Sequence, residues 1–136
     1  MLYLDSWVWL EYVLGGDTDG AVASVLEEAH ENGATTSAIA LAEIDYIVRR
    51  ELDRETADYV TSGIEDVSSI HVAPVTSDVA LRASGIRSKY YSRRERELSY
   101  ADAIHIATAL QMDCTVIHTG DTDFEAIEEI RTVIHR

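Results

Sequence analysis

The chain has few of the residues that cross-link a protein or interrupt its helices. It contains one cysteine, Cys114, and one proline, Pro74, among 136 residues. A lone cysteine excludes an internal disulfide framework and a zinc site built from several cysteines. No apolar run approaches the roughly 18–20 residues of a membrane span, and no basic and then apolar leader opens the sequence. We therefore expect a soluble, cytoplasmic protein that forms a single domain over residues 1–136.

Positive charge is also scarce. Eleven Lys and Arg residues face 25 Asp and Glu residues, which gives a net charge of −14, and Lys89 is the only lysine. Such a charge keeps a protein soluble but makes its compact state repel itself, and salt screens that repulsion. The composition predicts a halophilic protein, with an ordinary acidic protein as the alternative. It also disfavours nucleic-acid binding, which needs a basic surface, unless a metal supplies the positive charge.

Short apolar runs alternate with amphipathic segments along the chain. The expected strands are residues 1–4, 34–36, 70–73, 114–118 and 131–135. The expected helices are residues 6–14, 21–32, 37–52, 54–67, 77–91, 99–110 and 124–127, with Ser37, Ser77 and Ser99 as helix caps. Alternating strands and helices predict an α/β protein with a parallel sheet covered on both faces. Sites in such sheets lie at the carboxyl ends of the strands.

Four carboxylates are expected at that edge of the sheet. Asp5 directly follows the first strand, and Asp121 follows the strand over 114–118. Glu43 and Asp102 lie near the starts of helices that follow loops. Grouped carboxylates repel one another unless a cation neutralises them, and oxygen ligands select hard ions such as Mg²⁺ or Mn²⁺. The pattern predicts a metal site that acts on phosphate oxygens.

Each acid also has a purely structural interpretation. Ser99 and Asp102 form a capping-box pattern, so Asp102 could simply satisfy backbone amides. Asp5 could cap the first helix, and Glu43 could be a solvated helix residue. Asp121 and Asp123 could stabilise a turn. Two acids that end strands at one predicted edge favour the metal site.

Four blocks of sequence resemble the conserved blocks of PIN-domain nucleases, and most closely those of VapC-type toxins. These blocks are MLYLDS at 1–6, ALAEI at 40–44, LSYADAIHIATA at 98–109 and VIHTGDTDF at 116–124. They span nearly the whole chain in the family's order.

The resemblance implies a three-layer α/β/α sandwich with a central, mainly parallel sheet. It implies an endoribonuclease that depends on Mg²⁺ or Mn²⁺. Residues that match the family's acidic positions are Asp5, Glu43, Asp102 and Asp121, with Asp123 as a further metal ligand. Ser6 and Thr119 match small hydroxyl positions beside the acids.

The resemblance also implies partners. The substrate is RNA, and family members are commonly homodimers held by a small antitoxin protein. A PIN nuclease of RNA processing or repair and a non-catalytic PIN-fold interaction module stay open as alternatives. A phosphatase with an aspartate nucleophile is disfavoured, because such enzymes usually need a second acid two residues further on, where this chain has Trp7.

The only basic cluster is Arg93, Arg94 and Arg96. It could steer phosphates toward the site through the guanidinium fork, or it could pair with Glu95 and Glu97 on a solvated segment. His105 lies three residues after Asp102 and could be a metal ligand or a satisfied interior histidine.

Overall fold

A parallel sheet forms the middle layer of the molecule. The computed structural model describes residues 1–16, 20–91 and 98–135. The strands are β1 (Leu2–Leu4), β2 (Ala34–Ser37), β3 (Ile70–Ala73), β4 (Val116–Thr119) and β5 (Arg131–Ile134). They lie in the order β3-β2-β1-β4-β5, and all four described pairings are parallel.

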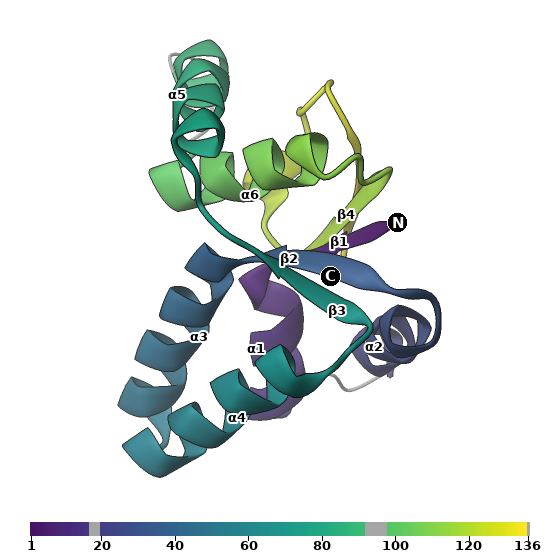
Figure 1. The fold of residues 1–136 in the computed structure, drawn as a ribbon, viewed down its shortest axis with the longest axis vertical. Helices are drawn as coiled ribbons and strands as arrows, with labels where there is room; N and C mark the ends of the chain where they lie inside the picture. Colours follow the sequence, from purple (N-terminus) through teal and green to yellow (C-terminus); the bar gives the residue numbers. More distant parts are fainter. Residues whose placement is uncertain (17–19, 92–97, 136) are drawn as a thin grey trace.

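Helices cover both faces of this sheet (Figure 1). The helices are α1 (Ser6–Leu14), α2 (Ala21–Asn32), α3 (Ala38–Glu51), α4 (Arg54–Asp66), α5 (Ser77–Tyr91) and α6 (Tyr100–Gln111), followed by a short 3₁₀ helix, η1 (Thr122–Phe124). Helices α1 to α4 lie on one side of the sheet, and α5 and α6 lie on the other. This is the three-layer α/β/α sandwich that the sequence predicts.

Two apolar cores follow from this layering. Successive residues of a strand point to opposite faces, so Leu4 packs with the α1–α4 helices and Tyr3 packs with α5 and α6. Both side chains are fully buried. By the same alternation, Asp5 is placed on the Tyr3 side, toward α6.

Local hydrogen bonds explain where most helices begin, and they correct three predicted details. The Ser37 hydroxyl accepts from the Ile39 amide and caps α3, as expected. Helix α5 is capped by Thr76 and not by Ser77, because the Thr76 hydroxyl accepts from the Val79 amide. The helix expected over 124–127 is instead η1, which Asp121 caps through the Asp123 amide. Strand β4 begins at Val116 rather than at 114.

The chain order places a topological switch beside β1. From β1 the chain moves outward through β2 to β3, then returns to the other side of β1 to form β4 and β5. Loops therefore diverge at the carboxyl ends of β1 and β4, which leaves room for a site between them. Asp5 follows β1 at this point, and Thr119 ends β4.

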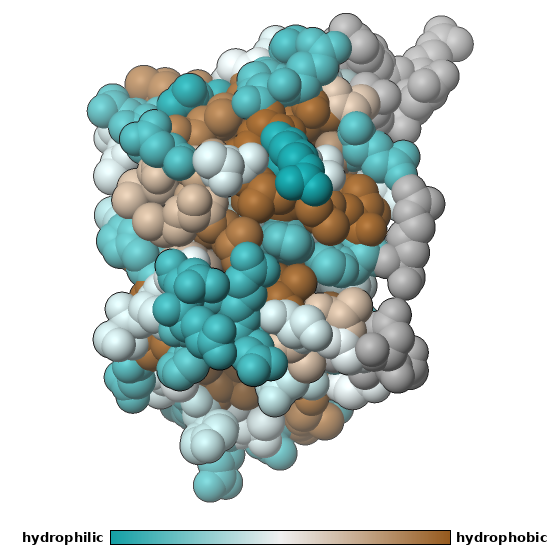
Figure 2. Space-filling model, turned by 90° about the vertical axis from the view of Figure 1, so that its right-hand side faces the viewer, coloured by the Kyte–Doolittle hydropathy of each residue, from teal (hydrophilic) through white to brown (hydrophobic). Residues whose placement is uncertain are grey.

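The surface is mixed in polarity. Figure 2 shows a face on which hydrophilic residues surround a band of exposed apolar side chains. No helix in the described part of the chain combines the length and the apolar character needed to cross a membrane.

Candidate active site

Asp5 lies at the centre of the switch point. It occupies the position before α1, yet its side chain makes no capping hydrogen bond there. Instead, the Thr119 hydroxyl donates to Asp5 Oδ2 at 2.5 Å, and the Ser6 hydroxyl donates to Oδ1 at 3.2 Å. The residue is 5 % exposed. The carboxylate is thus turned into the site and held by two hydroxyls, and its structural interpretation as a helix cap is wrong.

A first acidic group joins Asp5 to Glu43 on α3 and His105 on α6. His105 Nε2 lies 2.6 Å from Glu43 Oε1 and 3.4 Å from Asp5 Oδ1. His105 is fully buried, and Glu43 is partly exposed. Burial on its own lowers the pKa of His105, but the nearby carboxylates of Asp5 and Glu43 outweigh it and raise the pKa overall.

A second acidic group consists of Asp102, Asp121 and Asp123. One carboxylate oxygen from each can be chosen so that all three lie within 4.8 Å of one another. Asp102 completes a capping box: its Oδ2 accepts from the Ser99 amide, and its own amide donates to the Ser99 hydroxyl. Asp102 therefore does cap α6, as its structural interpretation predicts. A carboxylate has several lone pairs, so capping and metal binding are compatible at this residue.

The two groups share one electrostatic environment. Burial, followed by the negative charge of Asp121 and a smaller contribution from Asp5, raises the pKa of Asp102 to about 6. Burial also raises the pKa of Asp121, and the charges of Asp123 and Asp5 act in the same direction. Within the described part of the chain, no lysine or arginine forms an ion pair with any of these acids.

This donor set fits a hard divalent cation. Carboxylate oxygens are the preferred ligands of Mg²⁺ and Mn²⁺, and a cation would relieve the repulsion that raises the pKa values of Asp102 and Asp121. The acids that could hold such an ion are Asp5 and Glu43 in the first group and Asp102, Asp121 and Asp123 in the second. Thr119 supports both groups, because its Oγ1 donates to Asp5 and accepts from the Asp121 amide at 3.1 Å.

The predicted site residues fall into three sets. The structure brings the five acids to this region with Ser6 and Thr119 beside Asp5. Arg93, Arg94 and Arg96 lie outside the described residues. The sequence interpretation left the place of His105 open and did not single out its hydrogen-bond partner, Tyr3. The available signals were helical spacing, which sets His105 one turn after Asp102, and strand alternation, which sets Tyr3 on the same face as Asp5.

Two further histidines, His118 and His135, contact each other through their side chains. His118 Nδ1 is 3.0 Å from His135 Nε2, and the His135 ring stacks on Trp7. Burial, then the charges of His135 and Arg131, lowers the pKa of His118 to about 4. His118 is therefore neutral at pH 7 and acts in packing.

Comparisons with known structures agree with this architecture. VapC20 of Mycobacterium tuberculosis, a toxin that cleaves the sarcin–ricin loop, shares 22 % identity over 93 % of this chain and 94 % of its own, with a TM-score of 0.77. The FitAcB structure from Neisseria gonorrhoeae shares 25 % identity over 97 % of this chain and 96 % of that one, with a TM-score of 0.71. VapBC2 of Rickettsia felis, bound to a promoter DNA fragment, shares 15 % identity over 98 % of both chains, with a TM-score of 0.76. None of the curated proteins matches this sequence.

Fold and site together define an α/β protein with an acidic centre at the carboxyl edge of a parallel sheet. The family model of the PIN domain matches residues 2–130. The chain belongs to the PIN domain family.

Proposed function

We propose that this protein is an endoribonuclease that depends on Mg²⁺ or Mn²⁺ and cleaves RNA phosphodiester bonds. The observation that carries the proposal is that five acids, contributed by the end of β1, α3, α6 and the η1 segment, form two neighbouring groups in a chain of the PIN family. A divalent cation bound there would activate water and stabilise the charge that develops on phosphate. The site needs no side-chain nucleophile for that reaction.

The chain's own residues have distinct tasks in this proposal. Asp5, held by Thr119 and Ser6, presents a carboxylate of fixed orientation. Asp102 is held by the first turn of α6, and Asp121 by the turn that leads into η1. Rigid supports of this kind keep catalytic groups in their productive geometry. Glu43 is the most exposed of the group that includes Asp5 and lies where substrate can approach.

Asp5→Asn tests the proposal most directly. The substitution keeps the side chain's size and removes one negative charge from the site. We expect RNA cleavage and Mn²⁺ affinity to fall together, while the stability of the metal-free protein stays equal or rises because repulsion is relieved. Asp45→Asn is the matched control, since Asp45 forms an exposed pair with Arg49 on α3.

Wild-type activity in purified Asp5→Asn, with contaminating nuclease excluded by a mock purification, would leave a non-catalytic PIN-fold interaction module as the better hypothesis. Metal-dependent cleavage without any protein partner in the cell would instead favour a nuclease of RNA processing or repair.

We further propose that the protein is the toxin of a toxin–antitoxin pair. The similar structures include VapBC complexes from Rickettsia felis and Salmonella typhimurium and a toxin–antitoxin complex from Klebsiella pneumoniae. A small antitoxin encoded beside this gene is the expected partner, and a homodimer is the expected assembly. Co-expression of the neighbouring reading frame and light scattering of the purified complex test both.

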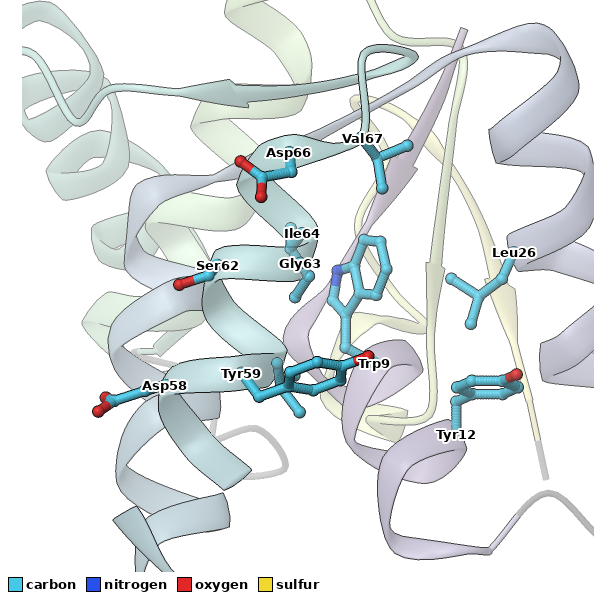
Figure 3. Close-up of a pocket in the computed structure, with 11 residues that line it drawn as sticks. Trp9, Tyr12, Leu26, Asp58, Tyr59, Ser62, Gly63, Ile64, Asp66 and Val67 are labelled. Atoms are coloured by element: carbon cyan, nitrogen blue, oxygen red, sulfur yellow. The ribbon is translucent and has the colours of Figure 1, made fainter. Parts of the chain in front are cut away.

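An apolar pocket offers this partner a docking surface. It has a volume of about 690 Å³ and is lined by α1, α2 and α4. Figure 3 shows Trp9 at its centre, with Leu26 on one side and Gly63 and Ile64 on the other. The buried Trp9 Nε1 has no hydrogen-bond partner among the described residues. Asp58 and Asp66 lie at the pocket, so a segment with apolar and basic side chains would complement it.

The pocket has a matched pair of test residues. Tyr59 is 81 % exposed and lines the pocket, whereas Tyr46 is 62 % exposed on α3 outside it. We expect Tyr59→Glu to weaken binding of the neighbouring small protein at least tenfold, and Tyr46→Glu to leave binding unchanged. Equal affinities for both variants would exclude the pocket as the docking surface.

A further inference from the structure

A buried hydrogen-bond chain reaches the acidic site from the interior of the sheet. Tyr3, on β1, places its hydroxyl oxygen 2.5 Å from His105 Nδ1. Both residues are fully buried, and their rings meet edge to face with centroids 5.7 Å apart. The opposite ring nitrogen, Nε2, faces Glu43 and Asp5. His105 therefore joins a core tyrosine to two of the candidate metal ligands.

The hydrogen-bond partners of Tyr3 decide which nitrogen of His105 carries the proton. The Ser37 amide donates to the Tyr3 oxygen. A tyrosine hydroxyl, whose ordinary pKa is about 10, keeps its proton at neutral pH. A buried hydroxyl proton needs an acceptor, and His105 Nδ1 is placed to accept it. In the neutral form of the ring, Nδ1 is then bare and the ring proton is on Nε2.

We infer that Tyr3 fixes His105 in the Nε2–H tautomer and that His105 is a positioning residue, whose N–H holds the Glu43 and Asp5 carboxylates in place. The inference rests on the proposed function only in taking those two carboxylates as metal ligands. The 2.6 Å contact with Glu43 is a strong donor–acceptor pair, and the 3.4 Å contact with Asp5 is weaker. One N–H thus lies close to both the Glu43 and the Asp5 carboxylates, which would otherwise repel each other.

This assignment differs from direct coordination by His105. A coordinating histidine binds its metal through a bare nitrogen and usually donates its other N–H to an oxygen. Here the nitrogen that faces the acids carries the proton. The two possibilities also differ in metal preference, because both ions favour oxygen ligands but Mn²⁺, as a transition metal, accepts an imidazole nitrogen more readily than Mg²⁺ does.

The tautomer can be read directly by ¹⁵N nuclear magnetic resonance of the metal-free protein. Long-range ¹H–¹⁵N correlations distinguish Nδ1–H from Nε2–H rings, and His105→Gln assigns the signal among the five histidines. At a pH where the ring is neutral we expect a protonated Nε2 in the wild type and loss of that preference in Tyr3→Phe. A protonated Nδ1 in the neutral wild-type ring overturns the inference, whether or not the protein cleaves RNA.

Metal binding provides the second test. Outer-shell changes typically cost 10–100-fold in metal affinity. We expect Tyr3→Phe and His105→Leu to weaken Mn²⁺ and Mg²⁺ binding by the same factor, roughly tenfold or more. His105→Gln, whose amide N–H can replace the Nε2 donor, restores most of the affinity. Selective loss of Mn²⁺ affinity, with no rescue by glutamine, would instead identify His105 as a direct ligand.

Tyr90→Phe is the matched control for Tyr3→Phe. Tyr90 is also buried, and its hydroxyl donates to Glu129 and accepts from the Glu128 amide, away from the acids. We expect this variant to lose stability and keep its metal affinity. If Tyr90→Phe weakens metal binding as much as Tyr3→Phe does, the effect of Tyr3 is general destabilisation and the positioning role is refuted. A wild type that binds neither ion refutes the proposed function, while the resonance test still decides the tautomer.

Discussion

Asp102 combines two functions at one position. Its carboxylate caps α6 through the Ser99 amide and also belongs to the acidic group with Asp121 and Asp123. The capping bond favours the ionised form, whereas burial and the charge of Asp121 favour the neutral form. The second influence prevails, since the pKa of Asp102 lies at about 6. A free carboxylate would already be ionised well below that pH.

This raised pKa predicts how the stability of the metal-free protein depends on pH. The folded state holds the Asp102 proton more tightly than the unfolded state, so the group's contribution to stability falls as pH rises from 3.8 to about 6. Asp102→Asn removes this contribution. In chelator, we expect the free energy of unfolding to decline less over this range for Asp102→Asn than for the wild type, as measured by urea unfolding at several pH values.

Asp45→Asn serves as the control, because Asp45 lies in an exposed ion pair. Its pH profile should parallel that of the wild type. If the pH profile of Asp102→Asn also parallels that of the wild type, then the pKa of Asp102 is not raised and the acids of the site are not electrostatically coupled.

Single residues also show what the sequence can and cannot predict about the site. Asp5 and Asp121 could be expected at one edge because both follow strands of a parallel sheet. The Tyr3–His105 contact joins residues 102 positions apart. Its prediction needs the distance between β1 and α6, which periodicity alone does not provide. The capping role of Asp102 and its place among the acids could both be predicted from the sequence. The direction in which its pKa shifts could not, because that depends on burial.

At the scale of elements, two substitutions at the start of α6 can distinguish the helix-capping role of this segment from its proposed metal-binding role. Ser99→Ala removes the hydroxyl that accepts from the Asp102 amide but keeps the Asp102 carboxylate. We expect a loss of about 0.5–2 kcal/mol in unfolding free energy and RNA cleavage within a few-fold of wild type. Asp102→Asn should remain folded and lose cleavage. Thermal unfolding and a cleavage assay on both variants test these expectations. An inactive but well-folded Ser99→Ala would contradict the separation of capping from catalysis.

The turn after β4 depends on close packing against α1. A Cβ added at Gly120 would lie 2.0 Å from Trp7 Cε2, closer than atoms can approach. We expect Gly120→Ala to cost about 1–3 kcal/mol, since overpacking forces side chains to move. Gly85→Ala is the control, because nothing lies within 4 Å of its added Cβ. In α5 that change should stabilise by roughly 0.5–1 kcal/mol, and chemical unfolding measures both.

Boundaries of elements were less predictable than their existence. The five strands and the six main helices all lie where alternating apolar runs placed them. The cap of α5 was misassigned because Thr76 and Ser77 are both good capping residues, and only backbone geometry chooses between them. The segment after Asp121 forms η1 because Asp121 accepts from the amide two residues on and fixes a tight turn.

At the scale of the whole molecule, the distribution of charge raises a question about substrate binding. The net charge is −14, and RNA carries a negative charge on every phosphate. Electrostatic attraction over the whole surface therefore cannot drive association. In the proposed function, a divalent cation held by the acidic residues would supply the local positive charge, so binding of RNA should depend on the divalent metal as strongly as cleavage does.

The same net charge predicts that salt stabilises the fold. Repulsion among surface acids is strong at low ionic strength, and the screening length shrinks to about 3 Å at 1 M salt. We expect the thermal midpoint of the protein to rise by more than about 5 °C between dilute buffer and molar KCl, which for a domain of this size corresponds to a gain of roughly 1–2 kcal/mol.

Three exposed acids on α2, Glu27, Glu28 and Glu31, provide the comparison. Changing all three to glutamine alters the net charge from −14 to −11. That variant should melt higher than the wild type in dilute buffer and gain less from KCl, because part of the repulsion is already gone. A wild-type midpoint that does not move with KCl would show that this is an ordinary acidic protein and that the composition reflects no adaptation to salt.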